Sequence, residues 1–222
     1  MSPVFRVDPK RPDQAGASID HAVRALVSGR LVVFPTETVY GIAARPDLSE
    51  ATDRLFAAKR RPRGLALPVL APSTESAWEV ALATKAAERL AERFWPGPLT
   101  LVLERADASR GWRLGEEAGS VGVRVPAHPL TAALLSRAGP LATTSANLSG
   151  RPPVAEPGEL TATFGDSVAV YLLLAPGGPE PEGRPSTVVD VRGPEPKILR
   201  RGAIEQAEVL RALEVPGGRR TR

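Results

Sequence analysis

Residues 31–43 read LVVFPTETVYGIA, a short apolar run that is closed by Pro35 and followed by a polar segment. Residues 31–34 have the length and composition of a buried strand. Gly29, just before them, marks the end of an amphipathic helix over residues 19–28. The hydroxyls after the strand either cap a following helix, with Thr36 or Thr38 as N-cap, or bind a polar ligand where strands end in an open α/β sheet.

The same alternation of short strands and helices continues on both sides of this stretch. Further strands are predicted at residues 67–70, 99–103, 119–125, 141–144, 168–174 and 187–191, helices at 48–60, 75–94, 129–138 and 206–213, and a hairpin over 193–200. Ser49 is available as the cap of the second helix. The 20 glycines and 23 prolines divide the chain into short elements. The pattern predicts a single α/β domain at residues 18–204, after a loose segment at 1–17 and before a C-terminal helix and basic tail at 205–222.

Composition excludes several classes of protein. The 222 residues are 42% hydrophobic and 24% charged, which is typical of a globular chain rather than a disordered one. No run approaches the roughly 18 to 20 apolar residues of a membrane span, and the N-terminus lacks the apolar core of a signal peptide, so we expect a cytoplasmic protein. The absence of cysteine excludes a disulfide, a zinc ribbon, iron–sulfur ligation and a thiol nucleophile, and two histidines leave little for a histidine-based metal site.

Basic residues indicate two candidate sites for an anionic group. The net charge is only +4, but 25 of the 29 basic residues are arginine, whose fork suits carboxylate and phosphate. KRRPRG, residues 59–64, indicates either an anion site or a solvated helix end. Arg124 interrupts the apolar strand GVRV and needs a partner, which is either an internal acid or a ligand carboxylate.

Hydroxyl-rich segments follow other strands. TTSANLSG at residues 143–150 forms either simple turns or a loop that cradles anionic oxygens. FWPGPLT at 94–100 is read as a stiff structural turn. PSTVVD at 185–190 and ILRRG at 198–202 are either edge and turn chemistry or the far wall of a pocket. The sequence contains neither a P-loop nor a dinucleotide-binding motif.

Taken in order, FPTETVYGIA, KRRPRGLALPVL, FWPGPLTLVL, VGVRVPAHPL, TTSANLSG, STVVDV and ILRRGAI resemble the YrdC/YciO family of threonylcarbamoyl-AMP synthases, from about residue 18 to residue 204. The resemblance implies an open, twisted, mixed α/β sheet curved around a large concave basic cavity. It implies synthesis of threonylcarbamoyl-adenylate and pyrophosphate from threonine, bicarbonate and ATP with Mg²⁺, for N6-threonylcarbamoyladenosine in tRNA. Downstream threonylcarbamoyl-transfer proteins would be partners, with tRNA or double-stranded RNA as a further contact and no membrane.

The resemblance also implies roles for individual residues. Those expected around threonine are Thr36, Arg124, Thr143 and Ser186. Those expected to act on ATP and the carbamate are Lys59, Arg61, Ser145 and Asn147, and the ATP site would also include Thr100, Pro153 and Arg200. On this reading the carbamate is the nucleophile, so the protein only has to hold and neutralise its reactants.

Three positions depart from the family pattern. Ala66 replaces a proline, Leu70 replaces a histidine that is a candidate threonine contact, and Arg201 replaces the proline of ILRPG. Two other readings of the same residues stay open. One is a paralogue of the YciO type that lacks synthase activity, and the other is an RNA-binding module without catalysis, whose affinity would fall steeply with salt.

Overall fold

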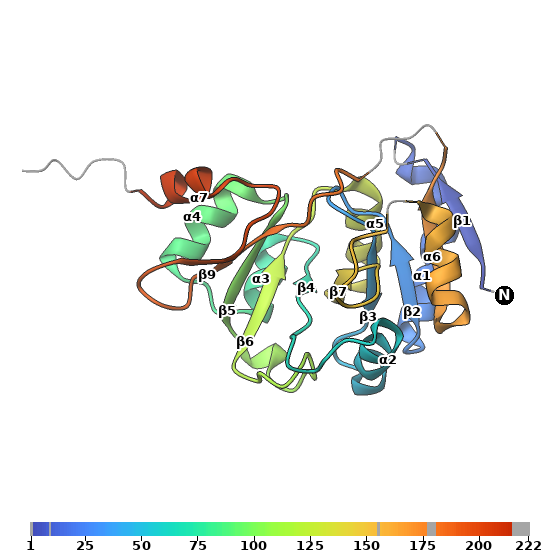
Figure 1. Ribbon diagram of the computed structural model, residues 1–222, viewed down its shortest axis with the longest axis horizontal. Helices are drawn as coiled ribbons and strands as arrows, with labels where there is room; N and C mark the ends of the chain where they lie inside the picture. The colour runs from blue at the N-terminus through green and yellow to red at the C-terminus, as the bar shows by residue number, and fades with distance from the viewer. Residues whose placement is uncertain (1, 9, 155, 177–180, 215–222) are drawn as a thin grey trace, which may run out of the picture.

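A computed structural model describes residues 2–8, 10–154, 156–176 and 181–214. Ten strands form one mixed sheet in the order β1-β8-β2-β3-β7-β4-β6-β5-β9-β10, and Figure 1 shows this sheet running the length of the molecule. The strands are β1 (Val4–Val7), β2 (Leu31–Phe34), β3 (Gly41–Ala44), β4 (Val69–Leu70), β5 (Leu99–Glu104), β6 (Ser120–Arg124), β7 (Leu141–Ser145), β8 (Val168–Leu174), β9 (Thr187–Asp190) and β10 (Lys197–Arg200).

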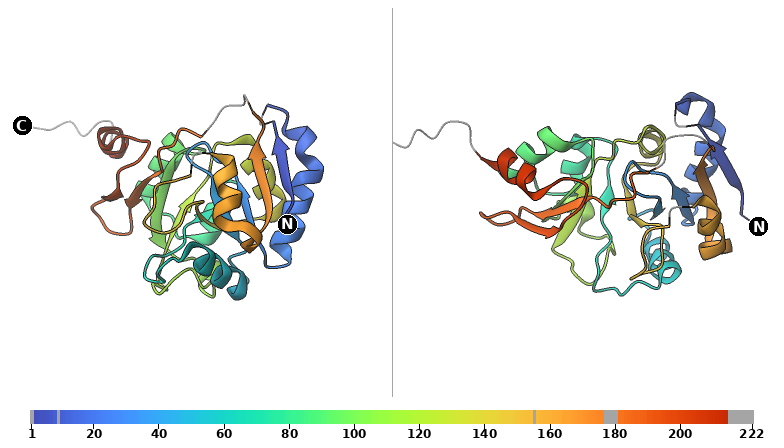
Figure 2. Two further views of the ribbon diagram at one scale, coloured as in Figure 1. Left: turned by 45° about the vertical axis from the view of Figure 1, so that its right-hand side comes forward. Right: turned by 45° about the horizontal axis from the view of Figure 1, so that its top comes forward.

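Seven α-helices and three short 3-10 helices connect the strands of the described chain. The α-helices are α1 (Gly16–Val27), α2 (Ser49–Lys59), α3 (Thr74–Val80), α4 (Lys85–Phe94), α5 (Pro129–Ala138), α6 (Pro157–Phe164) and α7 (Gln206–Leu213). The 3-10 helices are η1 (Pro12–Ala15), η2 (Asp107–Ser109) and η3 (Gly165–Ser167). Figure 2 shows β1 and α1 at one end of the molecule and β9 and α7 at the other.

Both faces of the sheet are covered at the β2 end. Because strand side chains alternate between faces, Leu31 and Val33 of β2 enter one hydrophobic core, and Val32 and Phe34 enter the other. The second core lies under α1 and α5, which contact each other. The first core continues along the sheet under α2, α3 and α4. Complete burial of all four residues explains why this strand reads as a continuous apolar run.

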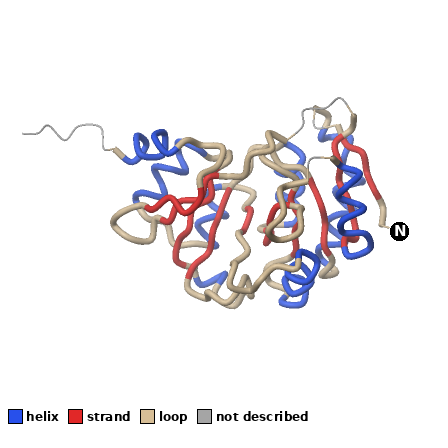
Figure 3. The backbone as a smooth tube through the Cα atoms, in the orientation of Figure 1, coloured by secondary structure: helices blue, strands red, loops and turns tan. Residues whose placement is uncertain are grey.

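In β5, the alternating side chains face a hydrophobic core on one side of the strand only. Leu99, Leu101 and Leu103 are fully buried in the first core. Thr100 and Val102, on the opposite face, border a cavity instead of a second layer of helices. In Figure 3, much of the middle of the molecule consists of loops rather than helices. The open face of the sheet is therefore the place where a ligand could bind.

The predicted fold class, an open twisted sheet in a single mixed α/β domain, is confirmed, and most predicted elements are present. The expected helix over 75–94 is two helices, because residues 81–84 are extended and Thr84 caps α4. Strands β1 and β3 and helix α6 were not predicted. β1 pairs with β8, so residues 4–7 of the segment expected to be loose belong to the sheet. The tail at 215–222 lies outside the described residues.

Two predicted helix caps are wrong. Leu48, not Ser49, occupies the N-cap position of α2, with extended backbone dihedrals. The segment after β2 leads into the antiparallel strand β3, with Val33 opposite Ile42, and not into a helix. Neither Thr36 nor Thr38 is therefore a helix cap. No helix among the described residues has both the length and the hydropathy required to cross a membrane.

Candidate active site

A cavity of about 490 Å³ lies on the open face of the sheet, along β7, β6, β5, β9 and β10. Residues of β6 that border it include Ser120, Gly122 and Arg124. It brings together nine of the eleven predicted site residues: Thr36, Arg61, Thr100, Arg124, Thr143, Ser145, Pro153, Ser186 and Arg200. The other two, Lys59 and Asn147, are buried behind the cavity wall.

Three arginines from distant parts of the chain border this one cavity. Arg61 follows α2, Arg124 ends β6 and Arg200 ends β10. Burial lowers the pKa of Arg200, and the positive charges of Arg124 and Arg61 lower it further. Burial alone lowers the pKa of Arg61. A ligand that carries negative charge would relieve the mutual repulsion of these guanidinium groups.

Arg61 and Arg200 are held by neutral groups. Arg61 donates from Nε to the carbonyl of Leu65 at 2.8 Å and from Nη2 to that of Ala66 at 2.9 Å. Arg200 donates from Nη2 to the carbonyl and the hydroxyl of Ser186, at 2.8 and 2.9 Å. These bonds orient both guanidinium groups without cancelling their charges.

Arg124 has an internal acid as its partner. Its Nη2 lies 2.7 Å from Glu37 Oε1, and both side chains are largely buried. The two groups form an ion pair, and Nη2 makes no hydrogen bond. Nε donates to the carbonyl of Gly97 at 3.0 Å, and Nη1 donates to Thr38 Oγ1 at 3.1 Å. Of the two partners left open by the sequence, the structure shows the internal acid.

The segment after β2 is organised around the hydroxyl of Thr36. Thr36 Oγ1 donates to the carbonyl of Val39 at 2.6 Å and lies 2.9 Å from Thr38 Oγ1. Since its hydrogen is already used, Thr38 must be the donor between the two hydroxyls. Thr36 is thereby linked to Arg124 through Thr38. Thr36 and Arg124, two of the four residues predicted around threonine, therefore belong to one hydrogen-bond network.

Lys59 is buried and forms hydrogen bonds with the backbone of the loop after β7. Its side chain is 1% exposed, and Nζ donates to the carbonyls of Ser145 and Asn147. In return, the amide of Ser149 donates to the carbonyl of Lys59 at 2.9 Å. Burial lowers the pKa of Lys59 to about 8, with the charge of Arg61 as a second cause. Asn147 donates from Nδ2 to the carbonyls of Leu148 and Arg151, and its buried Oδ1 has no hydrogen-bond partner.

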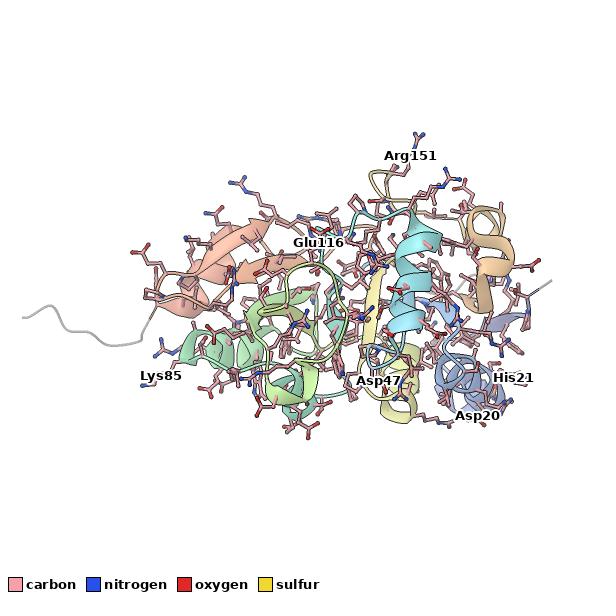
Figure 4. All side chains as sticks on the ribbon, turned by 90° about the horizontal axis from the view of Figure 1, so that it is seen from below. Asp20, His21, Asp47, Lys85, Glu116 and Arg151 are labelled. Carbon is pink, nitrogen blue, oxygen red and sulfur yellow. The ribbon has the colours of Figure 1, made fainter. Side chains whose placement is uncertain are left out.

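Hydroxyl groups line the rest of the cavity. Thr100 Oγ1 and Ser186 Oγ lie 2.8 Å apart, in contact with Arg200. Thr143 Oγ1 donates to the carbonyl of Leu141 at 3.0 Å. Pro153 lies at an exposed part of the wall. Arg151, nearby in sequence, extends away from the body of the molecule in Figure 4.

The three departures from the family pattern fall in or beside the cavity. Ala66 and Leu70 both border it, and the carbonyl of Ala66 accepts a hydrogen bond from Arg61. Arg201 is exposed. The hydrogen bond to Arg61 uses only the backbone carbonyl of residue 66, so an alanine at this position can accept it.

The sequence analysis missed Glu37, Thr38 and Gly97 as site residues. Thr38 was considered among the hydroxyls that either cap a helix or bind a polar ligand, but it was not assigned to the site, and Gly97 was considered only as part of a turn. The contact of Glu37 with Arg124 spans 87 positions of sequence, and no local pattern announces it. A buried arginine in a strand signals that some acid must lie opposite, but not which one.

A resident metal does not fit the side chains seen here. In the described ranges, no group of three or more acidic or histidine side chains could hold an ion by itself. Mg²⁺ is commonly held by substrate phosphates with few protein ligands. If it takes part, it would enter this cavity as a component of its complex with ATP.

The fold and this cavity define a mixed α/β protein with a polar cavity on one face of a twisted sheet. The family model for Sua5, YciO and YrdC, described as "Telomere recombination", matches residues 24–202. The chain therefore belongs to the Sua5/YciO/YrdC family.

Relatives and solved structures agree with this membership. A Mycobacterium tuberculosis protein is 38% identical over 205 residues, which are 92% of this chain and 93% of the relative. Threonylcarbamoyl-AMP synthase of Bacillus subtilis is 34% identical over 86% of this chain and 55% of its own length. The structure of Pyrococcus abyssi Sua5 complexed with L-threonine has a TM-score of 0.79 and 31% identity, covering 96% of this chain and 60% of that one. This chain thus spans little more than half of the last two proteins.

Proposed function

We propose that this protein forms threonylcarbamoyl-AMP and pyrophosphate from L-threonine, bicarbonate and ATP. The observation that carries the proposal is that Arg61, Arg124 and Arg200 border one cavity together with the hydroxyls of the predicted site. The threonine bound to P. abyssi Sua5, and the name of the B. subtilis relative, support the choice of substrates. Residues 18–204 would form the catalytic domain.

The chemistry needs no nucleophile from the protein. The threonine amine would attack the carbon of bicarbonate, losing a proton as hydroxide leaves, to give a carbamate. A carbamate oxygen would then attack the α-phosphorus of ATP and displace pyrophosphate. The reaction class is nucleotidyl transfer. Holding the reactants together contributes about 7–11 kcal/mol in well-oriented reactions, and this is the main task assigned to the cavity.

We assign the phosphates to the two cavity arginines that have no acidic partner among the described residues. Arg61 and Arg200 would neutralise the triphosphate and the departing pyrophosphate, and the charge of Lys59 would act through the loop it supports. Ser145 and Asn147 would orient the carbamate and the α-phosphate. Thr100 and Pro153 would contact ATP at the cavity wall. Mg²⁺, when bound with ATP, would supply further neutralisation of the phosphates.

We assign threonine to the neighbouring part of the cavity, beside Arg124. Arg124 would bind its carboxylate, while Thr36, Thr143 and Ser186 would contact its ammonium and hydroxyl groups. A site that hydrogen-bonds a substrate hydroxyl discriminates strongly against an analogue without one. The product would be passed to proteins that modify tRNA, and we propose a cytoplasmic location because ATP, bicarbonate and tRNA are all available there.

The deciding experiment is incubation with ATP, Mg²⁺, bicarbonate and labelled threonine, followed by chromatography. We expect a labelled mixed anhydride and an equal amount of pyrophosphate, both of which disappear when bicarbonate or threonine is omitted. Failure to form the anhydride with folded protein would contradict the proposal. Salt-sensitive RNA binding without this product would favour the RNA-binding alternative, and absence of both would favour a paralogue of the YciO type.

A further inference from the structure

The four arginines that border the cavity differ in how their charges are balanced. Arg124 lies against the carboxylate of Glu37 at 2.7 Å. Arg61 and Arg200 make no ion pair with any described residue, and their hydrogen-bond partners are neutral. Arg192, at another part of the wall, is balanced by Asp190. The cavity therefore has two arginines whose charges no described acid offsets, and one, Arg124, whose charge is offset by Glu37.

Glu37 is held in a costly position. Its Oε1 accepts a hydrogen bond from the amide of Ala127 at 3.1 Å, but its buried Oε2 has no hydrogen-bond partner. His128, which is next in sequence to Ala127, is also buried, and burial lowers its pKa. A buried acceptor without a partner reduces stability, and a structure normally avoids one unless the group has a function. The negative charge of this carboxylate is the property through which it could serve such a function.

The balance of charge determines which ligand suits each part of the cavity. A carboxylate behind a guanidinium opposes the approach of phosphate and favours a ligand that brings its own positive charge. The zwitterion of an amino acid has both charges and a net charge of zero. We propose, on the basis of the function proposed above, that Glu37 is a specificity-determining residue, which keeps the Arg124 part of the cavity for the amino acid and directs the phosphates to Arg61 and Arg200.

Glu37 does not border the cavity, so this role differs from a direct contact with substrate. Glu37 is a positioning residue that acts through Arg124, because its carboxylate offsets the charge of that guanidinium group. Replacing it with glutamine keeps the shape and the acceptor oxygen but leaves Arg124 with an uncompensated charge. The variant would then attract phosphate groups to the place of the amino acid, and two ligands that bind side by side in the native protein would compete.

The test is isothermal titration with L-threonine, alone and with saturating inorganic pyrophosphate. In the native protein we expect pyrophosphate to change the threonine Kd by less than twofold. In Glu37→Gln we expect pyrophosphate to raise it tenfold or more. A Glu37→Gln protein in which the two ligands still bind independently would overturn the inference. If the native protein binds no threonine, the proposed function itself fails, so the two failures are distinguishable.

Two controls separate charge from shape. Asp47→Asn removes a carboxylate that pairs with Arg45 on the turn before α2, outside the cavity, and should behave as the native protein does. Glu37→Asp keeps the charge one methylene further back and should keep the two ligands independent. Competition in Glu37→Asp as strong as in Glu37→Gln would show that shape excludes pyrophosphate, and would overturn the inference.

A second measurement uses the native protein alone, so it does not depend on the folding of a variant. 2,3-Dihydroxybutanoate, with the stereochemistry of L-threonine, replaces the ammonium group with a hydroxyl and is an anion. A part of the cavity without net charge should bind this anion at least tenfold more weakly than threonine. Equal or tighter binding of the anion would contradict the proposed role of Glu37.

Discussion

Lys59 Nζ donates a hydrogen bond to the backbone carbonyl of Ser145, which ties the last residue of α2 to the end of β7, 86 positions later in the chain. Asn147 accepts a second bond from the same ammonium group. A charged group with 1% exposure thus lies directly under the loop that borders the cavity. This position makes both the stability and the activity of the protein depend on one proton.

The first prediction concerns that proton. Burial lowers the pKa of Lys59 to about 8 from its ordinary 10.5. Between these pH values the unfolded chain retains a proton that the folded protein has lost, so the free energy of unfolding should rise with pH, by up to about 3 kcal/mol. Over the same range kcat/KM for ATP should fall, because the positive charge under the loop disappears.

The measurement is urea denaturation and pyrophosphate release between pH 7 and pH 10.5. Lys59→Met should lack this rise in stability. Lys85→Met, at an exposed lysine on α4 that Figure 4 labels, should keep it. Equal pH dependence in the native protein and Lys59→Met would refute the prediction.

The second prediction concerns Arg61. Arg61→Ala removes one of the two uncompensated charges of the cavity, and the loss of one such contact to a transition state usually costs about a hundredfold in rate. We expect adenylate formation to fall by that order or more, with little change in melting temperature. Arg63→Ala is the matched control, since Arg63 pairs with Asp53 and does not border the cavity. Near-normal pyrophosphate release by Arg61→Ala would rule out this role.

The third prediction concerns Gly202, which packs against the backbone beside Ser186. A Cβ at residue 202 would lie 2.4 Å from the carbonyl carbon of Ser186 and from the amide of Thr187. Because backbone cannot move aside as a flexible side chain can, Gly202→Ala should reduce stability by about 1–3 kcal/mol and displace Ser186. We expect weaker threonine binding together with a lower denaturation midpoint.

Gly193 is the control for this substitution, because a Cβ there would meet nothing within 4 Å. Gly193→Ala should leave both the denaturation midpoint and the threonine Kd unchanged. If Gly202→Ala binds threonine as the native protein does, the contact with residues 185–187 does not position Ser186.

The fourth prediction concerns the end of α2. Arg60 has φ 51° and ψ 41°, the left-handed conformation that side chains with a Cβ disfavour. Arg60→Gly should raise the free energy of unfolding by about 0.5–1 kcal/mol, after allowing for the greater freedom of glycine in the unfolded chain. Arg60→Ala removes the same side chain but keeps the Cβ, so thermal denaturation should show no comparable gain. Equal effects of the two substitutions would contradict the explanation.

Much of the fold was predictable because local patterns carry it. Residues 168–174 and 206–213 were assigned correctly as β8 and α7, since an apolar run and an amphipathic period depend on neighbours in sequence. β3 was missed because the strand Gly41–Ala44 has only four residues, and three of them are glycine or alanine. Its identity as a strand comes from pairing with β2 and, about 100 residues later in the chain, with β7. Pairing between segments about 100 residues apart leaves no local signal.

The sequence by itself determined the alternation of strands and helices, the absence of thiol chemistry, and the residue types available to the site: hydroxyls, amides and guanidinium groups. Only the tertiary structure decided how their charges are balanced. It placed Glu37 against Arg124, and among the described residues it gave Arg61 and Arg200 only neutral hydrogen-bond partners. The physical reason is that secondary structure follows from interactions between near neighbours, whereas the energy of an ion pair depends on the distance between atoms, which packing of the sheet alone sets.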